Sequence, residues 1–132
     1  MAIHNDIGKI GEDLAVKWLV DKGYQMVTRN YRKPFGEIDI VARETKGRIH
    51  FVEVKSVSYE TRDLLEYAVS HETWRPEEMV HREKQRRFKN IIQTWLSENP
   101  NIIDFQIDII TVRLVPREKY ARISIIENVI FD

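Results

Sequence analysis

The chain has 132 residues, and its 21 lysine and arginine residues balance 21 aspartate and glutamate residues, so the formal net charge at pH 7 is zero. This length suits one domain, expected over residues 1–132, that buries its core without disulfides or a structural metal. The balanced charge excludes a general attraction for nucleic acid, and the absence of cysteine excludes thiolate zinc sites and disulfide frameworks. We expect a cytoplasmic protein with no membrane span, because no apolar stretch approaches the roughly 20 residues that a span needs and residues 1–9 lack the pattern of a signal peptide.

The first predicted element is a helix that begins at a cap on Asn5 or Asp6 and ends at Gly23. Its apolar residues recur at helical spacing: Ile7, Ile10, Leu14, Ala15, Trp18 and Leu19.

Three polar or small positions of this helix point to a site. Glu12 falls at the border of the apolar stripe, so its carboxylate should emerge at the rim of the core. Gly8 and Gly11 each destabilise a helix by about 1 kcal/mol relative to alanine, which indicates close approach of another backbone or of a ligand. The alternative is a solvated glutamate beside glycines that serve packing.

A short strand at residues 25–30 and a turn at residues 32–36 lead into a predicted β-hairpin. A three-residue loop at residues 45–47, with Gly47 in the left-handed conformation, closes this hairpin. Its register pairs Glu44 with Arg48, Val41 with Phe51, Asp39 with Glu53, and Glu37 with Lys55. The opposite face is apolar and carries Ile38, Ile40, Ala42, Val52 and Val54.

The predicted register places two carboxylates opposite each other, and this is the feature of the hairpin that says most about function. Asp39 and Glu53, roughly 5 Å apart and partly buried, would raise each other's pKa or require a cation between them, and a divalent ion is the usual solution. Lys55 follows on the same face, and an acid, a spacer, a second acid and a lysine in this order are typical of metal-dependent nucleases. A structural ion pair between Lys55 and one acid is the alternative, but it leaves the second carboxylate without a partner.

The rest of the chain alternates helix and strand. We expect residues 57–80 to form an irregular excursion, with a short helix near residues 63–69 and with Trp74 available for base stacking or a partner. A helix at residues 77–98, an inner strand at 105–110 and a last strand at 121–131 follow.

Two basic clusters, at residues 29–33 and 82–89, are candidates for local contacts to nucleic acid. The residues selected from them are Arg32, Lys33, Lys84 and Arg87. Arg86 and Arg87 point about 100° apart, so we expect only one of them to face the acids. Solvated helix and loop faces are the alternative for both clusters. The four histidines, including His50, lack helical zinc spacing and are expected at the surface or in packing roles.

Together these motifs resemble a known family. The pattern comprises Gly8-x-x-Gly11-Glu12, Gly36-Glu37-Ile38-Asp39-Ile40-Val41, Phe51-Val52-Glu53-Val54-Lys55 and Lys84-Gln85-Arg86-Arg87, and it resembles the YraN-like bacterial proteins. That family looks like a branch of the PD-(D/E)xK, or restriction endonuclease-like, nuclease superfamily and is similar to archaeal Holliday-junction resolvases. Two departures are Ile38, which stands where the superfamily has proline, and a segment between Lys55 and Lys84 that is longer than expected.

The resemblance implies an α/β fold with a central mixed β-sheet of about five strands flanked by helices. It also implies that Asp39 and Glu53 match the metal-binding acids, Lys55 the catalytic lysine and Glu12 the helix-borne acid of resolvase-like members. A homodimer is expected by analogy only.

The expected chemistry is hydrolysis of phosphodiester bonds in branched or flapped DNA. Asp39, Glu53 and the Val54 carbonyl would hold Mg²⁺ or Mn²⁺, and Lys55 would orient a water or neutralise developing charge. The alternative is a non-catalytic module that keeps the nuclease fold to bind DNA or a partner protein. The intact set of Asp39, Glu53 and Lys55 favours the enzyme.

Overall fold

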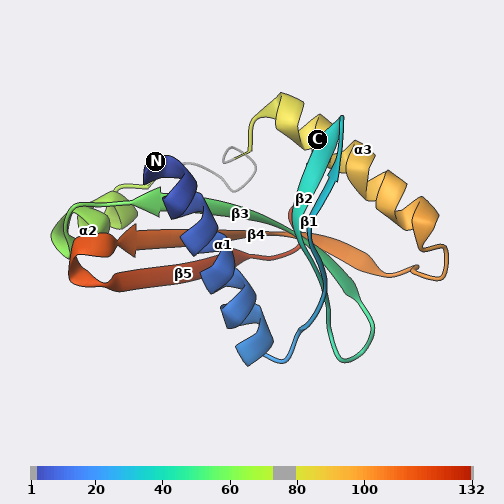
Figure 1. Cartoon of the computed structure of the whole chain (residues 1–132), viewed down its shortest axis with the longest axis horizontal. Coiled ribbons are helices and arrows are strands. Elements are labelled where there is room, and N and C mark those ends of the chain that lie inside the picture. Colours follow the sequence, from blue (N-terminus) through green and yellow to red (C-terminus); the bar gives the residue numbers. More distant parts are fainter. Residues whose placement is uncertain (1–2, 73–79, 132) are drawn as a thin grey trace.

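The protein is a five-stranded mixed sheet flanked by helices, seen in a computed structural model that describes residues 3–72 and 80–131 (Figure 1). The strands lie in chain order, and only β3 and β4 run parallel to each other. The predicted α/β architecture is therefore confirmed. The elements are α1 (Ile3–Asp21), β1 (Gln25–Lys33), β2 (Gly36–Arg43), β3 (Ile49–Ser58), α2 (Arg62–Ser70), α3 (Arg82–Glu98), β4 (Phe105–Val115), a short 3₁₀ helix (Pro116–Glu118) and β5 (Tyr120–Ile126).

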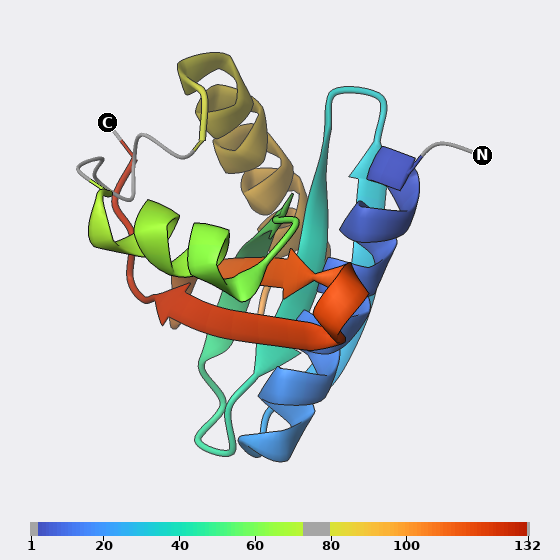
Figure 2. The ribbon, with the colours of Figure 1, turned by 90° about the vertical axis from the view of Figure 1, so that its left-hand side faces the viewer.

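Helices α1 and α3 cover opposite faces of the sheet (Figure 2). The core under α1 contains Ala15, Leu19, Ile40, Ala42, Val52, Ile110, Val112 and Leu114. The core under α3 includes Ile38, Val41, Phe51, Phe88, Ile91, Ile92 and Trp95. The inner strands β2, β3 and β4 therefore bury side chains on both faces of the sheet, whereas β1 and β5 contain no buried residue. Within the described residues, no helix is long and apolar enough to cross a membrane.

The hairpin of β2 and β3 has the predicted register. Val41 pairs with Phe51, the Glu44 amide donates to the Arg48 carbonyl at 3.0 Å, and Gly47 has a φ of +98°. The last pair of this ladder is Ile40 with Val52. Beyond that pair, β2 continues only with β1, as a two-stranded arm that rises away from β3 and β4 (Figure 1).

The arm changes the environment of one predicted face. Ile38 was expected beside Ile40 and Ala42, but it lies in the core under α3 with Val41 and Phe51. Two-stranded ribbons twist more strongly than wide sheets, so strict alternation relative to the helices fails where β2 leaves β3.

Several predicted boundaries move. Helix α1 begins at Ile3, before the expected caps at Asn5 and Asp6, and it ends at Asp21, two residues before the predicted stop at Gly23, whose φ is +97°. The turn expected at residues 32–36 contains only Pro34 and Phe35, because pairing with β2 extends β1 to Lys33.

Differences at the later elements follow from pairing and from long-range contacts. Helix α3 begins at Arg82, and residues 77–79 lie outside the described part of the chain. Pairing with β3 and β5 extends β4 beyond the predicted end at 110, to Val115. Strand β5 ends at Ile126 rather than at 131, since the Asn128 amide donates to buried Asp108 and the Val129 amide to Ile107.

The segment predicted to be irregular is more regular than expected. Val57 and Ser58 belong to β3, and α2 follows a cap in which Thr61 Oγ1 accepts the Leu64 amide hydrogen. Only Leu65 of α2 is buried, which explains why the sequence shows little periodicity there. Trp74 lies outside the described residues.

Candidate active site

The candidate site lies where β2 and β3 separate. Asp39 and Glu53 are the first residues beyond the last ladder pair of Ile40 and Val52. Here the Val54 amide donates to Asp39 Oδ2 at 2.8 Å, so an acidic side chain takes the place of the missing strand partner. The fork therefore fixes Asp39 next to Glu53 through a backbone hydrogen bond.

A pocket of about 730 Å³ opens at this fork, between the beginnings of α1 and α3. Its lining contains every residue predicted for catalysis or metal binding: Glu12, Asp39, Glu53, Val54 and Lys55. Lys55 is exposed in it, one residue beyond Val54. These side chains come from three elements, α1, β2 and β3, and the fold gathers them in one place.

Close packing of α1 against β3 brings Glu12 to the pocket. The sequence predicted that a backbone or a ligand approaches Gly11, but the Ser56 side chain does so: a Cβ atom on Gly11 would lie 1.9 Å from Ser56 Oγ and 2.8 Å from Ser56 Cβ. Gly8 faces open space and lines the pocket, so its role is not backbone contact. Arg29 donates to Glu12 at 3.1 Å and also to Asp13, so it is engaged with α1.

Burial favours the protonated form of both facing acids, Asp39 and Glu53. The Glu53 residue is 4% exposed, and its Oε2 atom has no hydrogen-bond partner among the described residues. Burial, and then the charge of Glu53, raise the pKa of Asp39 to about 8. Burial also raises the pKa of Glu53, although Lys84 opposes that shift. The two acids therefore favour a proton or a cation beside them.

Lys84 supplies such a cation, which the sequence did not predict. Its Nζ atom lies 2.5 Å from Glu53 Oε1, and its side chain is 55% exposed. We had selected Lys84 for nucleic acid, and no local pattern marks it as a partner of Glu53. The predicted pairing of Glu37 with Lys55 is wrong, because Glu37 follows the β1–β2 arm and binds Arg32 at 3.0 Å.

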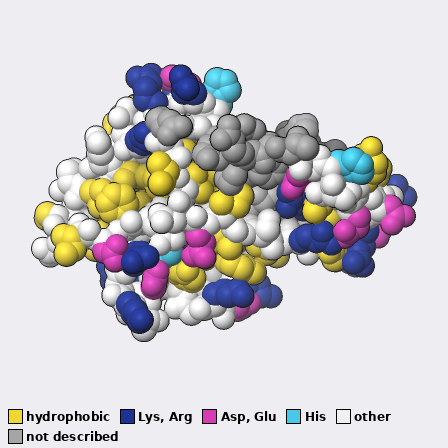
Figure 3. Space-filling view, turned by 180° about the vertical axis from the view of Figure 1, so that it is seen from behind, with side chains coloured by type: hydrophobic (Ala, Val, Ile, Leu, Met, Phe, Trp, Pro, Cys, Tyr) yellow, Lys and Arg dark blue, Asp and Glu magenta, His cyan; other side chains and the backbone are white. Residues whose placement is uncertain are grey.

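A second pocket, of about 360 Å³, adjoins the first and shares Lys84 with it. All four residues selected for nucleic-acid contact line this second pocket: Arg32, Lys33, Lys84 and Arg87. Arg86 instead binds Glu83 on the same helix, whereas Arg87 lines the second pocket and not the pocket of the acids. In Figure 3 cationic side chains gather over the beginning of α3.

Comparison with known proteins identifies the family. A family model described as "Uncharacterised protein family UPF0102" matches residues 11–112. A UPF0102 protein from Dictyoglomus turgidum is 38% identical over 116 residues, which cover 86% of this chain and 87% of that protein. A UPF0102 protein from Alkaliphilus oremlandii is 36% identical over 129 residues, covering 96% of this chain and 98% of the relative. The chain belongs to the UPF0102 family.

This membership confirms the family resemblance drawn from the motifs. The region matched to UPF0102 begins just before Glu12 and contains both acids of the fork, Lys55 and the beginning of α3. Both pockets of this UPF0102 protein are thus built mainly from the matched part of the chain.

The UPF0102 fold also buries a second acidic cluster, which the sequence did not reveal. His50 is 1% exposed, with Nδ1 2.6 Å from Asp108 and Nε2 2.5 Å from Glu44. Burial alone would lower the pKa of His50, but hydrogen bonds to Asp108 and Glu44 raise it above the usual value. Of the two roles expected for His50, a surface role is excluded, and its packing role takes the form of a buried hydrogen-bonded network. The sequence signal was slight: a histidine two residues before Val52 on a strand, six residues after Glu44.

Both clusters bear on metal binding. Ligand atoms of His50, Asp108 and Glu127 lie within 4.8 Å of one another, so this group could hold an ion. However, both ring nitrogens of His50 already contact carboxylates, and a metal would have to displace one of them. At the fork, Glu53 Oε2 has no hydrogen-bond partner among the described residues and lies beside Asp39, so it offers a ligand to a hard divalent cation, although Lys84 holds the other oxygen of Glu53.

Proposed function

We propose that this UPF0102 protein is an endonuclease that uses Mg²⁺ or Mn²⁺ to hydrolyse phosphodiester bonds of branched or flapped DNA. The observation that carries the proposal is the buried Oε2 atom of Glu53, which has no hydrogen-bond partner among residues 3–72 and 80–131 and lies in a pocket that also contains Asp39 and Lys55. Buried charges that lack a partner are costly, and they are concentrated at functional sites.

Asp39 and Glu53 would hold the ion, and the Val54 carbonyl is the third ligand that we propose. Lys84 would have to leave Glu53 Oε1, which its exposed side chain allows. A divalent ion bound here would polarise a phosphoryl oxygen and lower the pKa of a bound water. Glu12, held by Arg29 at the rim, is placed to orient such a water.

Lys55 is proposed to act on the transition state. It is exposed in the pocket two residues beyond Glu53, and strand alternation sends both side chains to the same face. An ammonium group there stabilises the negative charge that develops on the phosphate during attack.

The neighbouring basic pocket is proposed to hold the DNA strand. The whole molecule has no net charge, so attraction must come from a local group of cations. Such a group lines the second pocket, which adjoins the pocket of the acids: Arg32, Lys33 and Arg87.

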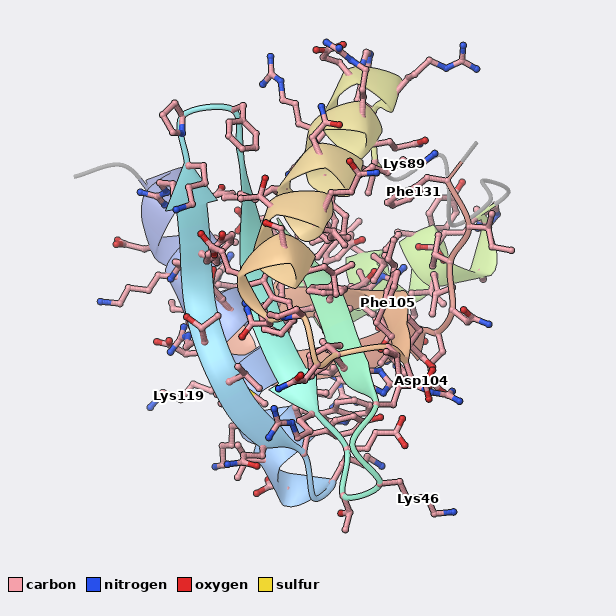
Figure 4. The ribbon with its side chains drawn as sticks, turned by 90° about the vertical axis from the view of Figure 1, so that its right-hand side faces the viewer. Lys46, Lys89, Asp104, Phe105, Lys119 and Phe131 are labelled. Carbon is pink, nitrogen blue, oxygen red and sulfur yellow. The ribbon has the colours of Figure 1, made fainter. Side chains whose placement is uncertain are left out.

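Cleavage of labelled flap, junction, single-stranded and duplex DNA in Mn²⁺ and Mg²⁺ tests the function. Lys55→Ala should reduce the rate by about 10²-fold or more, because it removes an interaction made mainly in the transition state. Lys46→Ala is the matched control, since Lys46 lies at the β2–β3 turn, far from the fork (Figure 4). Equal rates for Lys55→Ala and the parent protein would contradict the proposal.

The ion pair of Lys84 with Glu53 favours a second candidate, a non-catalytic module. A lysine that neutralises one acid reduces the demand for a metal. DNA binding without cleavage in either metal, together with no stabilisation of the fold by either metal, would select this alternative.

A further inference from the structure

The turn between β1 and β2 presents an aromatic ring beside the candidate site. Pro34 and Phe35 form this turn, and Phe35 is 46% exposed. Proline fixes its own φ angle, which limits the motion of the turn. A single exposed phenylalanine is common on proteins. Only the surroundings of Phe35 can therefore indicate whether it belongs to a binding site.

The turn is packed tightly against α3. A Cβ atom on Gly36 would lie 3.2 Å from the Arg87 carbonyl oxygen, so the glycine lets the two backbones approach. In Figure 4 the β1–β2 hairpin rises beside the first turns of α3. Phe35 from the turn and Arg87 from α3 therefore line one pocket.

Cationic side chains line the same pocket as Phe35, and three of them are Arg32, Lys33 and Arg87. Their acidic partners are Glu37, Glu98 and Glu83, respectively. All of these pairs are exposed, and such pairs contribute only about 0–1 kcal/mol each, so phosphate groups can replace the acids.

The size of the pocket limits its occupant. A volume of about 360 Å³ lies near the lower end of the range of small-ligand sites. It suits one nucleotide and is too small for a duplex. Lys84, shared by both pockets, places this nucleotide next to Asp39 and Glu53.

We propose that the pocket around Phe35 binds one unpaired nucleotide of a DNA strand, with its base against the phenyl ring and its phosphates on Arg32, Lys33 and Arg87. This inference rests on the proposed nuclease function and narrows its substrate. The unpaired nucleotide adjoins the phosphate to be cleaved. In a duplex each base is stacked on both sides, so it reaches an aromatic ring only after it is unpaired.

The contact would be tolerant of sequence. Every base has a face that can stack on an aromatic ring, and the remaining contacts are to phosphates. The preferred substrates are therefore flaps, bulges and single-stranded junction arms of any sequence.

Binding without catalysis tests the inference. Lys55→Ala protein in EDTA is titrated with a single-stranded oligonucleotide that carries 2-aminopurine, with a flapped duplex and with a fully paired duplex. Phe35→Leu keeps an apolar side chain but removes the aromatic face. It should weaken binding of the single strand and the flap about tenfold and abolish quenching of 2-aminopurine, whereas Phe35→Trp should retain both.

Tyr67→Leu is the matched control. Tyr67 is an exposed aromatic residue of α2, where it stacks on His71, outside the pocket. This change should alter neither affinity nor quenching. Melting temperatures of all variants establish that each is folded.

The outcomes separate the inference from the proposed function. Cleavage by the parent protein, with identical binding by Phe35→Leu, would overturn the inference and leave the nuclease intact. Binding that depends on Phe35, without cleavage in any metal, would support the nucleotide pocket and contradict the proposed nuclease function. Tighter binding of the fully paired duplex, or no binding of any oligonucleotide, would also overturn the inference.

Discussion

Two buried acidic clusters lie at opposite ends of the β2–β3 hairpin, and they differ in how their charge is neutralised. Near the turn, His50 contacts Asp108 through one ring nitrogen and Glu44 through the other. Asp108 also accepts hydrogen bonds from Gln106 and from the Asn128 amide. At the fork, Glu53 has one oxygen on a half-exposed lysine and another with no partner among the described residues.

The difference distinguishes a structural cluster from a candidate site. A fully hydrogen-bonded polar network can hold a fold together, whereas an incomplete one is costly unless something binds to it. The His50 cluster is complete within the chain and joins β2, β3 and β4. At the fork Asp39 keeps a proton until about pH 8 and Glu53 pairs with Lys84, and a divalent cation would replace both of these positive charges.

The largest expected effect is at the complete cluster. Asp108→Ala should destabilise the fold by about 3–5 kcal/mol, because it leaves His50 and two other donors buried without their acceptor. Urea unfolding measures this change. Asp104→Ala is the control, since the Asp104 side chain is 61% exposed and bound to Arg48, and its loss should alter stability by less than about 1 kcal/mol.

Similar stabilities for these two variants would contradict a structural role for the His50 cluster. In that case the cluster would not differ from a surface ion pair, and the contrast with the fork would fail.

Metal should act only at the fork. Mn²⁺ or Mg²⁺ at a hundred times its dissociation constant should stabilise the parent protein by about 2.7 kcal/mol, seen as a higher melting temperature. Glu53→Ala should abolish this response, while Glu44→Ala, at the other cluster, should retain it. A response lost in Glu44→Ala but kept in Glu53→Ala would move the metal to the His50 cluster.

A pH dependence should reveal the crowded acids. Since the pKa of Asp39 is raised from 3.8 to about 8, the folded state holds its proton more tightly than the unfolded chain does. The resulting stability is fully present below pH 3.8 and is lost as the pH rises through 8. Without metal, stability should therefore fall between pH 6 and pH 8, by at most about 1.4 kcal/mol per pH unit for one proton.

Asp39→Asn isolates this contribution from that of His50. The raised pKa of His50 also gives stability that is lost at higher pH, but that part remains in the variant. The fall between pH 6 and pH 8, followed by urea unfolding, should be shallower in Asp39→Asn. A fall as steep as in the parent would exclude Asp39 as its source.

The smallest expected effect is a gain in stability. Glu53→Gln, at pH 8 without metal, should stabilise the fold by about 1 kcal/mol, because an amide removes the like charge and can donate a hydrogen bond to Asp39. Equilibrium unfolding compares it with Glu37→Gln, which changes an acid of β2 whose side chain is exposed. A loss of stability in Glu53→Gln would show that the fork is a structural ion pair with Lys84.

The sequence could predict the part of the site that is built locally. The β2–β3 turn fixes the register of a hairpin, so Val41 with Phe51 implied Asp39 beside Glu53. The close approach at Gly11 could also be predicted, because glycine destabilises the interior of a helix and is expected there only where another group packs closely. The contacts that were missed join distant segments: Lys84 reaches Glu53 only after α3 packs on the sheet, and His50 reaches Asp108 only through the parallel pairing of β3 with β4.

The hydrogen bond from the Val54 amide to Asp39 has a consequence for how the site would bind its ligands. A flexible carboxylate loses rotational freedom when it coordinates an ion, and that loss weakens binding. Here the backbone has already fixed one oxygen of Asp39, and the same bond keeps the diverging strands together at their fork. The site is thus preorganised by the fold itself, and any small shift in the angle of the β1–β2 arm would change the separation of the two acids.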